Sequence, residues 1–190
     1  MSMRRMASVA AGALWVSVGL GSALAGRNVP RAAHFRLTSP AFADAGNIPT
    51  RFSCADPSAV SLPLKWSDPP AGTKSFALIM HDTDTAPNKD SMDVTHWIVW
   101  NVPASARSIP ADIKPGASPD GMRQGKNFHA VAGYLPVCPP PGWYRHHYVI
   151  ELFALDTMLS LPAGSTRAEL LNAMNGHIIG KSAYFGRFGR

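Results

Sequence analysis

Three apolar segments with the composition of β-strands organise the middle and the end of the chain. Residues 75–80 (SFALIM) and 95–102 (THWIVWNV) are rich in strand-forming side chains and are bounded by polar or proline-containing stretches. Residues 147–154 (HYVIELFA) form the third segment, and their near-continuous apolar run predicts a strand buried on both faces. We expect these three segments to be the central strands of a β-sheet.

The rest of the pattern favours short strands joined by many turns. The chain has 17 prolines and 16 glycines, spread without a period, which does not suit long helices. Residues 35–37, 51–53 and 62–66 are weaker strand candidates, and we expect them at sheet edges because prolines stand beside or within them. Residues 101–127 show little periodicity and are predicted to be a long excursion, a kind of segment that often carries function.

One short helix is predicted near the C-terminus. Thr166 and Glu169 have the spacing of a capping box, and Gly176 supplies a stop signal. The apolar face of this helix is expected to consist of three side chains that pack on the sheet, namely Leu170, Leu171 and Met174.

The N-terminus has the features of a secretory signal peptide. Arg4 and Arg5 precede an uncharged stretch over residues 6–20, and residues 23–25 (ALA) have the small side chains that a signal peptidase requires. We therefore predict a signal peptide over residues 1–25 and one domain over residues 26–190. An uncleaved membrane anchor and a buried N-terminal helix are the alternatives, and the stretch is short for a bilayer crossing.

Charge and size define the class of protein further. Removing 25 residues and two arginines from a 190-residue chain of net charge +6 leaves 165 residues of net charge +4, the size of one ordinary domain. The charge is only mildly basic and lacks dense Lys/Arg blocks, so we expect no nucleic-acid partner. We expect an exported protein, periplasmic or secreted, without a stable membrane anchor.

Two cysteines, Cys54 and Cys138, are the minimum for an internal disulfide in an oxidising compartment. We expect them to be bridged. The alternative is two separate buried thiols that act as small hydrophobic side chains.

The polar residues with chemical potential lie at the ends of the predicted central strands. Asp82 and Asp84 follow the first strand, His96 opens the second, and His146 and Tyr148 open the third. Imidazoles and a phenol can donate hydrogen bonds to phosphate oxygens, and a nearby carboxylate favours the charged imidazole. Together these residues predict an anion-binding site. Taken singly, the aspartates also fit an ordinary polar turn, and each histidine also fits a structural role.

A proline-rich segment, residues 133–142 (GYLPVCPPPG), precedes the third strand. Successive prolines fix the φ angle of the backbone, so this loop is rigid and can form one wall of a pocket. Its composition equally fits an inert stiff connector.

These segments together resemble the phosphatidylethanolamine-binding protein family, in its bacterial Raf-kinase-inhibitor-like branch. The resemblance rests on SFALIMHDTDTAP followed by HWIVWNVP, which look like the D-x-D-x-x-P and H-W elements of the family in the family's order. Further matches are GKNFHAVAGY, the proline-rich loop, HHY, the segment from ELFALD to NGHI, and the terminal FGR. The resemblance covers roughly residues 35–190.

The resemblance implies a mainly β fold, a Greek-key antiparallel β-sandwich with a large central sheet, a smaller sheet and a C-terminal helix. It also implies a small cavity that binds phosphate-like anions. Transferred position by position, the residues expected around the ligand are Asp82, His96, His146 and Tyr148, with Pro87, Pro139 and Pro140 as the wall. Asp84 would support this site from beside it, and Trp97 would pack beneath His96.

The sequence departs from the family pattern at two positions near this site. Pro136 and Val137 stand before Cys138 where the family usually has Gly-Pro, so a backbone N–H that faces the anion is lost or moved. His147 replaces a common arginine, and we expect its side chain on the opposite face of the strand.

The predicted function is therefore the binding of a phosphate-like anion or a phospholipid head group, with no cofactor and no chemical turnover. Inhibition of a protease, or regulation of an unidentified protein partner, is an alternative. A hydrolase or metal-dependent enzyme using Asp82, His96 and His146 ranks lower, because the chain has no G-x-S-x-G or H-E-x-x-H pattern. The sequence leaves the oligomeric state open, a homodimer included.

Export can be tested directly. We expect the intact mass of the exported protein to correspond to a chain that starts at Gly26, because the predicted cleavage follows Ala25. Mass spectrometry of the exported fraction measures this. A mass that retains residues 1–25 would contradict the signal-peptide prediction.

Overall fold

The computed structural model describes residues 34–85, 89 and 93–190. The predicted signal peptide over residues 1–25 and the predicted wall residue Pro87 lie outside the described residues. Within the described residues, no helix has the length and apolar character needed to cross a membrane.

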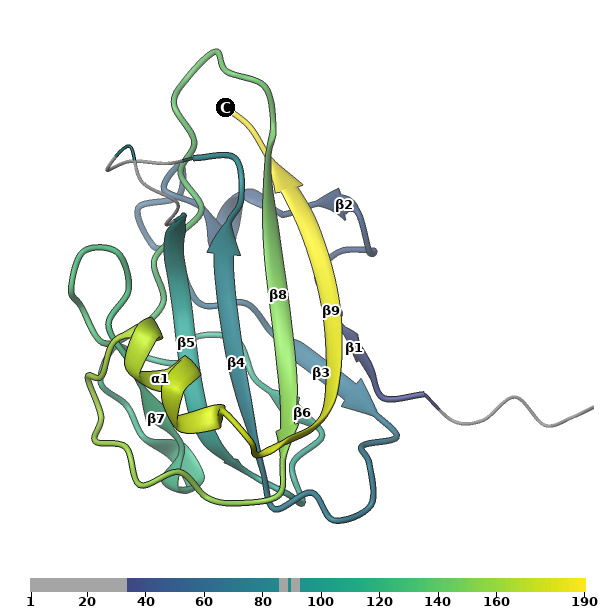
Figure 1. Cartoon of the computed structure of the whole chain (residues 1–190). Helices are drawn as coiled ribbons and strands as arrows, with labels where there is room; N and C mark the ends of the chain where they lie inside the picture. The colour runs from purple at the N-terminus through teal and green to yellow at the C-terminus, as the bar shows by residue number, and fades with distance from the viewer. Residues whose placement is uncertain (1–33, 86–88, 90–92) are drawn as a thin grey trace, which may run out of the picture. The chain divides into compact units, whose positions relative to one another are not determined.

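The described chain folds into two β-sheets and one α-helix (Figure 1). The large sheet has the strand order β2 (Gly46–Asn47), β9 (Ile178–Phe188), β8 (His146–Leu155), β4 (Ser75–Asp82), β5 (Val94–Pro103) and β7 (Arg123–Gln124). The small sheet has the order β1 (Arg36–Thr38), β3 (Leu64–Ser67) and β6 (Ser108–Ile109). Neighbouring described strands are antiparallel, apart from the short parallel pair of β2 and β9.

The connection between β5 and β8 gives the sheet its Greek-key character. After β5 the chain passes through β6, the 3₁₀ turn η2 (Pro119–Gly121) and β7, and it then returns as β8 beside β4. The predicted long excursion over residues 101–127 therefore holds the end of β5 and these three short elements. The prediction of a mainly β, two-sheet fold is confirmed.

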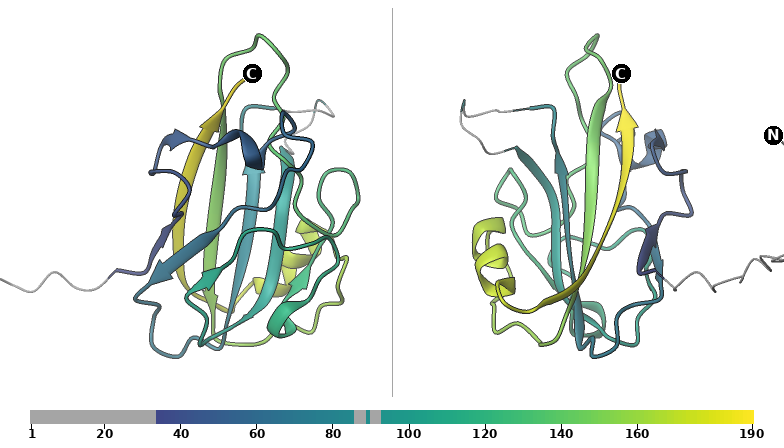
Figure 2. Two further views of the ribbon diagram at one scale, coloured as in Figure 1. Left: turned by 180° about the vertical axis from the view of Figure 1, so that it is seen from behind. Right: turned by 45° about the vertical axis from the view of Figure 1, so that its right-hand side comes forward.

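The large sheet is the middle of three layers, with the small sheet on one face and α1 (Arg167–Met174) on the other (Figure 2). Alternation along β4 explains its continuous apolar sequence. Phe76, Leu78 and Met80 join the core between the two sheets, whereas Ala77 and Ile79 join the core beneath α1. Both faces of β4 and β5 are thus buried, as the pattern of apolar residues predicts. The prediction that residues 147–154 are buried on both faces is wrong for the first half of β8, where His147, Val149 and Glu151 are only partly buried.

The predicted helix is present with its capping box. The backbone N–H of Glu169 donates to the hydroxyl of Thr166, and the backbone N–H of Thr166 donates to the Glu169 carboxylate at 2.7 Å. The expected apolar face is wrong at one position. Leu170 is fully buried, but Leu171 is 44% exposed, because the helix has only one side against the sheet.

Two of the weaker strand predictions need correction. Residues 51–53 do not form an edge strand: Thr50–Phe52 is the 3₁₀ turn η1, followed by a single bridge from Ser53 to Val137. The strand predicted over residues 62–66 exists as β3 but lies in the centre of the small sheet. Pro63 precedes the first residue of β3, so the proline removes no hydrogen bond from the ladder.

Sequence analysis missed β9, the longest strand of the described chain. Its sequence, IIGKSAYFGRF, begins with two exposed isoleucines and contains two glycines, so it lacks the alternation of a half-buried strand. The glycines have a packing role. A Cβ at Gly186 would lie 2.6 Å from the side chains of Ile48 and Phe42, so only glycine allows this close contact.

The two neighbouring leucines of α1 make a matched test of the helix packing. We expect Leu170→Ala to lower the free energy of unfolding by roughly 2–4 kcal/mol, because it opens a cavity in a closed core. Leu171→Ala is the control and should change stability by less than about 0.5 kcal/mol. Urea denaturation of the two variants measures the difference, and equal losses would contradict the observed orientation of α1.

Candidate functional site

The site lies where β8, β4 and β5 meet at one end of the large sheet. Asp82 is the last residue of β4, and it pairs with Tyr148 of β8 on one side and with Val94 of β5 on the other. His146 begins β8, two residues before Tyr148, so His146 and Tyr148 share one face of the strand. The strand register therefore brings together residues that are more than 60 positions apart in sequence.

A β-bulge brings His96 onto the same face. In the pairing of β4 with β5, Met80 lies opposite Trp97 and His81 lies opposite Thr95, so His96 is the extra residue. Such a bulge re-aims the side chain that simple alternation would send to the other face. The ring of His96 consequently packs edge-on against Tyr148, with the ring centres 5.1 Å apart.

Asp82 and His146 form a buried pair. Nδ1 of His146 donates to Oδ2 of Asp82 at 2.8 Å, and both side chains are almost fully buried. The other carboxylate oxygen, Oδ1, accepts the backbone N–H of Asp84 at 3.0 Å. Nε2 of His146 is buried and has no hydrogen-bond partner among the described residues. This nitrogen is the atom that the pair leaves for a ligand.

His96 is held by the backbone of the loop that faces it. Its Nδ1 donates to the carbonyl oxygen of Leu135 at 2.8 Å, since a carbonyl can only accept. Burial lowers the pKa of His96 below its usual value, and the bond to Leu135 offsets only part of that effect. His96 is therefore neutral at neutral pH in the free protein, with the Nε2 lone pair available.

Tyr148 lies beneath His96 as a neutral phenol. Burial, together with the nearby charge of Asp82, raises the pKa of its hydroxyl far above the usual value. The hydroxyl has no hydrogen-bond partner among the described residues. It can therefore act as a donor at any physiological pH.

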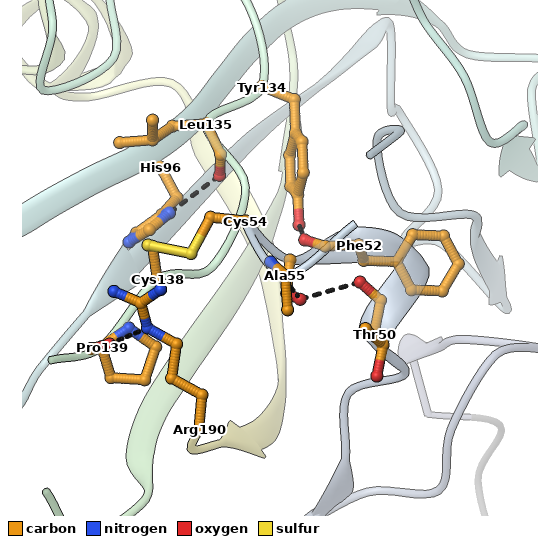
Figure 3. Close-up of a disulfide and its surroundings, with 11 residues drawn as sticks. Thr50, Phe52, Cys54, Ala55, His96, Tyr134, Leu135, Cys138, Pro139 and Arg190 are labelled. Atoms are coloured by element: carbon orange, nitrogen blue, oxygen red, sulfur yellow. Dashed lines mark hydrogen bonds between the residues drawn. A yellow bond between two sulfur atoms is a disulfide. The ribbon is translucent and has the colours of Figure 1, made fainter. Parts of the chain in front are cut away.

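A disulfide between Cys54 and Cys138 fixes the wall opposite these rings (Figure 3). The two Cα atoms are 5.3 Å apart across a separation of 84 residues. Hydrogen bonds strengthen the same contact: Cys54 N–H donates to Val137 O, and Val137 N–H donates to Phe52 O. The Tyr134 hydroxyl also donates to Phe52 O, at 2.8 Å. The predicted disulfide is thus present in the structure.

These features enclose a cavity of about 240 Å³. It is smaller than the usual pocket for a drug-sized ligand and suits a small ion or a head group. Strand-end residues and two facing loops form its lining: Asp82, Thr85, Val94, His96, Phe128, His129, Leu135, Pro136, Cys138, Pro140 and His146.

The structure brings most of the predicted site residues together. Asp82, His96, His146 and Pro140 line the cavity, and Tyr148 packs behind His96. Pro139 does not line it: this residue is buried in the loop, and its carbonyl accepts a hydrogen bond from Nε of Arg190. The prediction of Pro139 as wall is corrected, because neighbouring residues of a turning loop face different ways.

The two supporting residues also have defined contacts. Asp84 accepts hydrogen bonds from the backbone N–H and from Nδ1 of His147, the latter at 2.9 Å, and so fixes the start of β8. Trp97 packs in the core between the sheets, where its indole N–H donates to Gln124 at 2.9 Å. Its ring meets Tyr134 edge-on, so Trp97 supports the site from below.

The departure of the proline-rich loop from the family pattern, Pro136-Val137 in place of Gly-Pro, removes backbone hydrogen-bond donors from the cavity wall. Pro136 lines the cavity but has no N–H, and the N–H of Val137 is already bonded to Phe52 O. The wall therefore presents no N–H from these two residues. Hydrogen bonds to an anion would come mainly from the side chains on the strands.

Sequence analysis missed Phe128 and His129 as lining residues. They lie in a loop of the segment GKNFHAVAGY, whose backbone is fixed by bonds such as Phe128 N–H to Thr95 O. The resemblance to the family included this segment, but its pattern carries no sign of a side chain that faces the site. Within the described part of the chain, no group of three or more His, Cys, Asp or Glu side chains is arranged to hold a metal ion.

Comparison with known proteins defines the class to which this fold and cavity belong. A sequence profile described as phosphatidylethanolamine-binding protein matches residues 38–189. The chain is a member of the phosphatidylethanolamine-binding protein family.

Individual relatives are similar over most of their length. A UPF0098 protein of Methanothermobacter thermautotrophicus is 39% identical over 155 residues, which cover 81% of this chain and 98% of the relative. LppC of Mycobacterium tuberculosis, which has a provisional name as a lipoprotein, is 35% identical over 84% of this chain and 74% of its own.

Two solved structures are similar as well. CT736 of Chlamydia trachomatis, provisionally described as a homologue of the family, has a TM-score of 0.74 and 34% identity, covering 83% of this chain and 98% of its own. YbcL of Escherichia coli has a TM-score of 0.73 and 30% identity, covering 83% and 99%. This chain therefore shares both fold and sequence with bacterial members of the family.

The disulfide provides a test of how the wall is held. We expect the double variant Cys54→Ser/Cys138→Ser to lose roughly 2–5 kcal/mol of unfolding free energy, because the bridge closes a long loop in the unfolded chain. Urea denaturation measures the loss. Wild type treated with a reductant is the matched control and should unfold like the double variant. Two free thiols in the untreated, denatured wild type would contradict the bridge.

Proposed function

We propose that this chain is an exported binding protein whose cavity holds the phosphate of a small ligand or a phospholipid head group, without chemical turnover. The observation that carries the proposal is the buried His146 Nε2, which is orientated by Asp82 but has no partner among the described residues. A buried polar atom without a partner costs free energy, so a ligand that supplies one is favoured.

The neighbouring groups are suited to a phosphate. Tyr148 is a neutral donor, and His96 can accept from a protonated phosphate oxygen or, when it is itself protonated, donate to one. Asp82 does not oppose the anion with a free carboxylate, because both of its oxygens already accept hydrogen bonds. It can also attract the ammonium end of a zwitterionic head group.

Binding without turnover is supported by the state of the sulfur that lines the cavity. Cys138 would be the strongest nucleophile of the wall, but its thiol is consumed by the disulfide. The cavity lining otherwise combines Asp82, Thr85 and three imidazoles with apolar and proline side chains.

Export is part of the proposal and rests on three supports. The first is the arrangement of Arg4, Arg5 and the apolar stretch before Ala25. The second is the disulfide, which suits an oxidising compartment. The third is the provisional naming of the relative LppC as a lipoprotein.

The proposal predicts anion binding that strengthens at low pH. Binding an anion favours protonated His96, whose pKa is lowered in the free protein, so binding takes up a proton. We expect affinity to fall about three- to tenfold between about pH 5.5 and 8.5, a window around the usual imidazole value. Calorimetry with glycerophosphoethanolamine measures this cleanly, because a phosphodiester keeps one charge over that range.

Variants separate the roles within the site. His96→Gln should flatten the pH profile, because it removes the group whose protonation is coupled to binding. His146→Gln should lower affinity, because it removes the Nε2 that Asp82 orientates. Asp82→Asn should weaken phosphoethanolamine more than inorganic phosphate. His177→Gln is the matched control, since His177 pairs with Asp156 at an exposed position outside the cavity lining. An affinity that depends neither on pH nor on His146 would contradict the proposed site.

Catalysis is tested separately. Turnover of a phosphoester by the wild type that disappears in His96→Gln or His146→Gln would show that the protein is an enzyme and not only a binding protein.

A further inference from the structure

Three exposed aromatic side chains lie in the two loops next to the cavity. Trp143 is 58% exposed, Tyr144 is 61% exposed and Phe128 is 42% exposed. Large apolar side chains gathered in this way on a surface are associated with interaction sites. We call Phe128, Trp143 and Tyr144 the aromatic rim.

The aromatic rim adjoins the residues proposed to bind the anion. The rings of Trp143 and Tyr144 lie 6.3 Å and 5.5 Å from the ring of His146, measured between centres. Phe128 lines the cavity from the other loop. The green loop before β8, which carries Trp143 and Tyr144, projects beyond the end of the large sheet (Figure 1). The loop that carries two of the three rings is therefore accessible to a surface that meets this end of the sheet.

Cationic side chains accompany the rim. Arg145 follows Tyr144 and is exposed, and it donates to the side chain of Asn47 at 2.7 Å. Arg190 is bound to the same loop: its Nε donates to Pro139 O, and its carbonyl accepts the N–H of Gly142. The projecting loop thus combines aromatic rings with positive charge.

We propose that the aromatic rim, with Arg145 and Arg190, docks the protein on the surface of a phospholipid bilayer that contains anionic lipids. The phosphate of one lipid occupies the cavity. This inference rests on the proposed function and extends it by naming the source of the phosphate. Tryptophan and tyrosine rings are favoured at the head-group level of membranes, and arginines attract anionic lipids.

The size of the cavity favours a bilayer over a free ligand. About 240 Å³ accommodates a head group but not acyl chains, so the chains of a bound lipid must stay in an apolar medium. A bilayer provides that medium directly beyond the rim. A free phosphate ion would make no use of the exposed rings.

Vesicle binding tests the proposal through a built-in reporter. Trp66, Trp97 and Trp100 are buried, so a change in tryptophan emission of the protein that lacks residues 1–25 would come from Trp143. With vesicles of phosphatidylethanolamine and phosphatidylglycerol, we expect a blue shift and quenching by brominated lipid. Trp143→Tyr should keep binding but lose the shift, since tyrosine also suits the interface.

Matched variants separate docking from the cavity. Trp143→Ala/Tyr144→Ala should lower vesicle partitioning about tenfold or more, because two rings lose their burial in the interface. Met158→Ala is the control: Met158 is 52% exposed but follows the opposite end of β8, so it should leave partitioning unchanged. Arg145→Gln should lower partitioning about fivefold on vesicles with phosphatidylglycerol and little on zwitterionic vesicles.

The outcomes for docking and for anion binding are distinguishable. If the variant Trp143→Ala/Tyr144→Ala no longer binds vesicles but keeps its affinity for inorganic phosphate, both the docking proposal and the anion-site proposal are supported. If wild type binds phosphate but not vesicles, or binds vesicles equally well without the rim, docking is overturned and the anion site survives. If wild type binds a phosphorylated peptide through the rim and does not bind vesicles, the docking proposal is wrong and the partner is a protein. Vesicle binding that needs the rim, without any phosphate binding, would overturn the anion site instead.

Discussion

The buried pair of Asp82 and His146 is the contact on which the site depends. Moving a carboxylate and an imidazole out of water is costly, and the cost is offset only when their remaining polar atoms are satisfied. The Asp84 N–H satisfies the second oxygen of Asp82, and Nδ1 of His146 satisfies the first. One nitrogen, Nε2 of His146, is left over, and its position follows from the register of β4 against β8. The central sheet thus fixes the chemistry of the cavity.

The loops complete the site in a different way from the strands. The proline-rich wall is held by the disulfide, by the backbone contacts of Val137 and Cys54, and by Arg190 at the C-terminus (Figure 3). These contacts engage backbone groups that could otherwise face a ligand. The wall therefore contributes shape, whereas the strands contribute hydrogen-bonding side chains. This division leaves the recognition of a ligand to the side chains on the strands.

The central strands and the helix could be predicted from the sequence, because local signals there agree with the fold, whereas most of the site was predicted through the resemblance to the family. The double-sided burial of β4 requires a continuous apolar run, and the capping box marks the start of α1. The prediction of Leu171 as buried failed because periodicity does not tell how wide the covered face of a helix is. β9 was missed because its glycines serve contacts with distant residues such as Ile48, which no local pattern records.

The bulge at His96 and the position of Phe128 in the cavity wall also depend on contacts between residues that are distant in sequence. Alternation alone places His96 and Trp97 on opposite faces, and only the pairing with β4 reveals the extra residue. The resemblance to the family identified His96 for a reason that the local pattern does not contain. Exposed Trp143 and Tyr144 carried no signal either, because single aromatic residues in a loop are common until their surroundings are known.

A second ionic cluster on the opposite face of the sheet is built beside the first. His81 precedes Asp82 on β4 and bonds to Asp93, which in turn pairs with Arg167 of α1. Glu151 of β8 pairs with Lys181 of β9 and lies 3.6 Å from Nε2 of His81. Because His81 and Asp93 adjoin Asp82 and Val94, this cluster fixes the strand ends that carry the cavity.

Two members of this second cluster, Glu151 and His81, have shifted pKa values. The nearby imidazole of His81, together with Lys181, lowers the pKa of Glu151 to about 2. The contribution of Glu151 to stability is therefore present above the usual carboxyl value and is lost only as pH falls from there towards 2. Burial alone would lower the pKa of His81, but the nearby carboxylates of Glu151 and Asp93 outweigh that effect and raise it. The contribution of His81 is therefore complete below the usual imidazole value and is lost as pH rises through the raised one. Both groups support the fold between the usual carboxyl value and the usual imidazole value, so a gain in anion affinity as pH falls through that range reflects the cavity and not a loosening of the sheet.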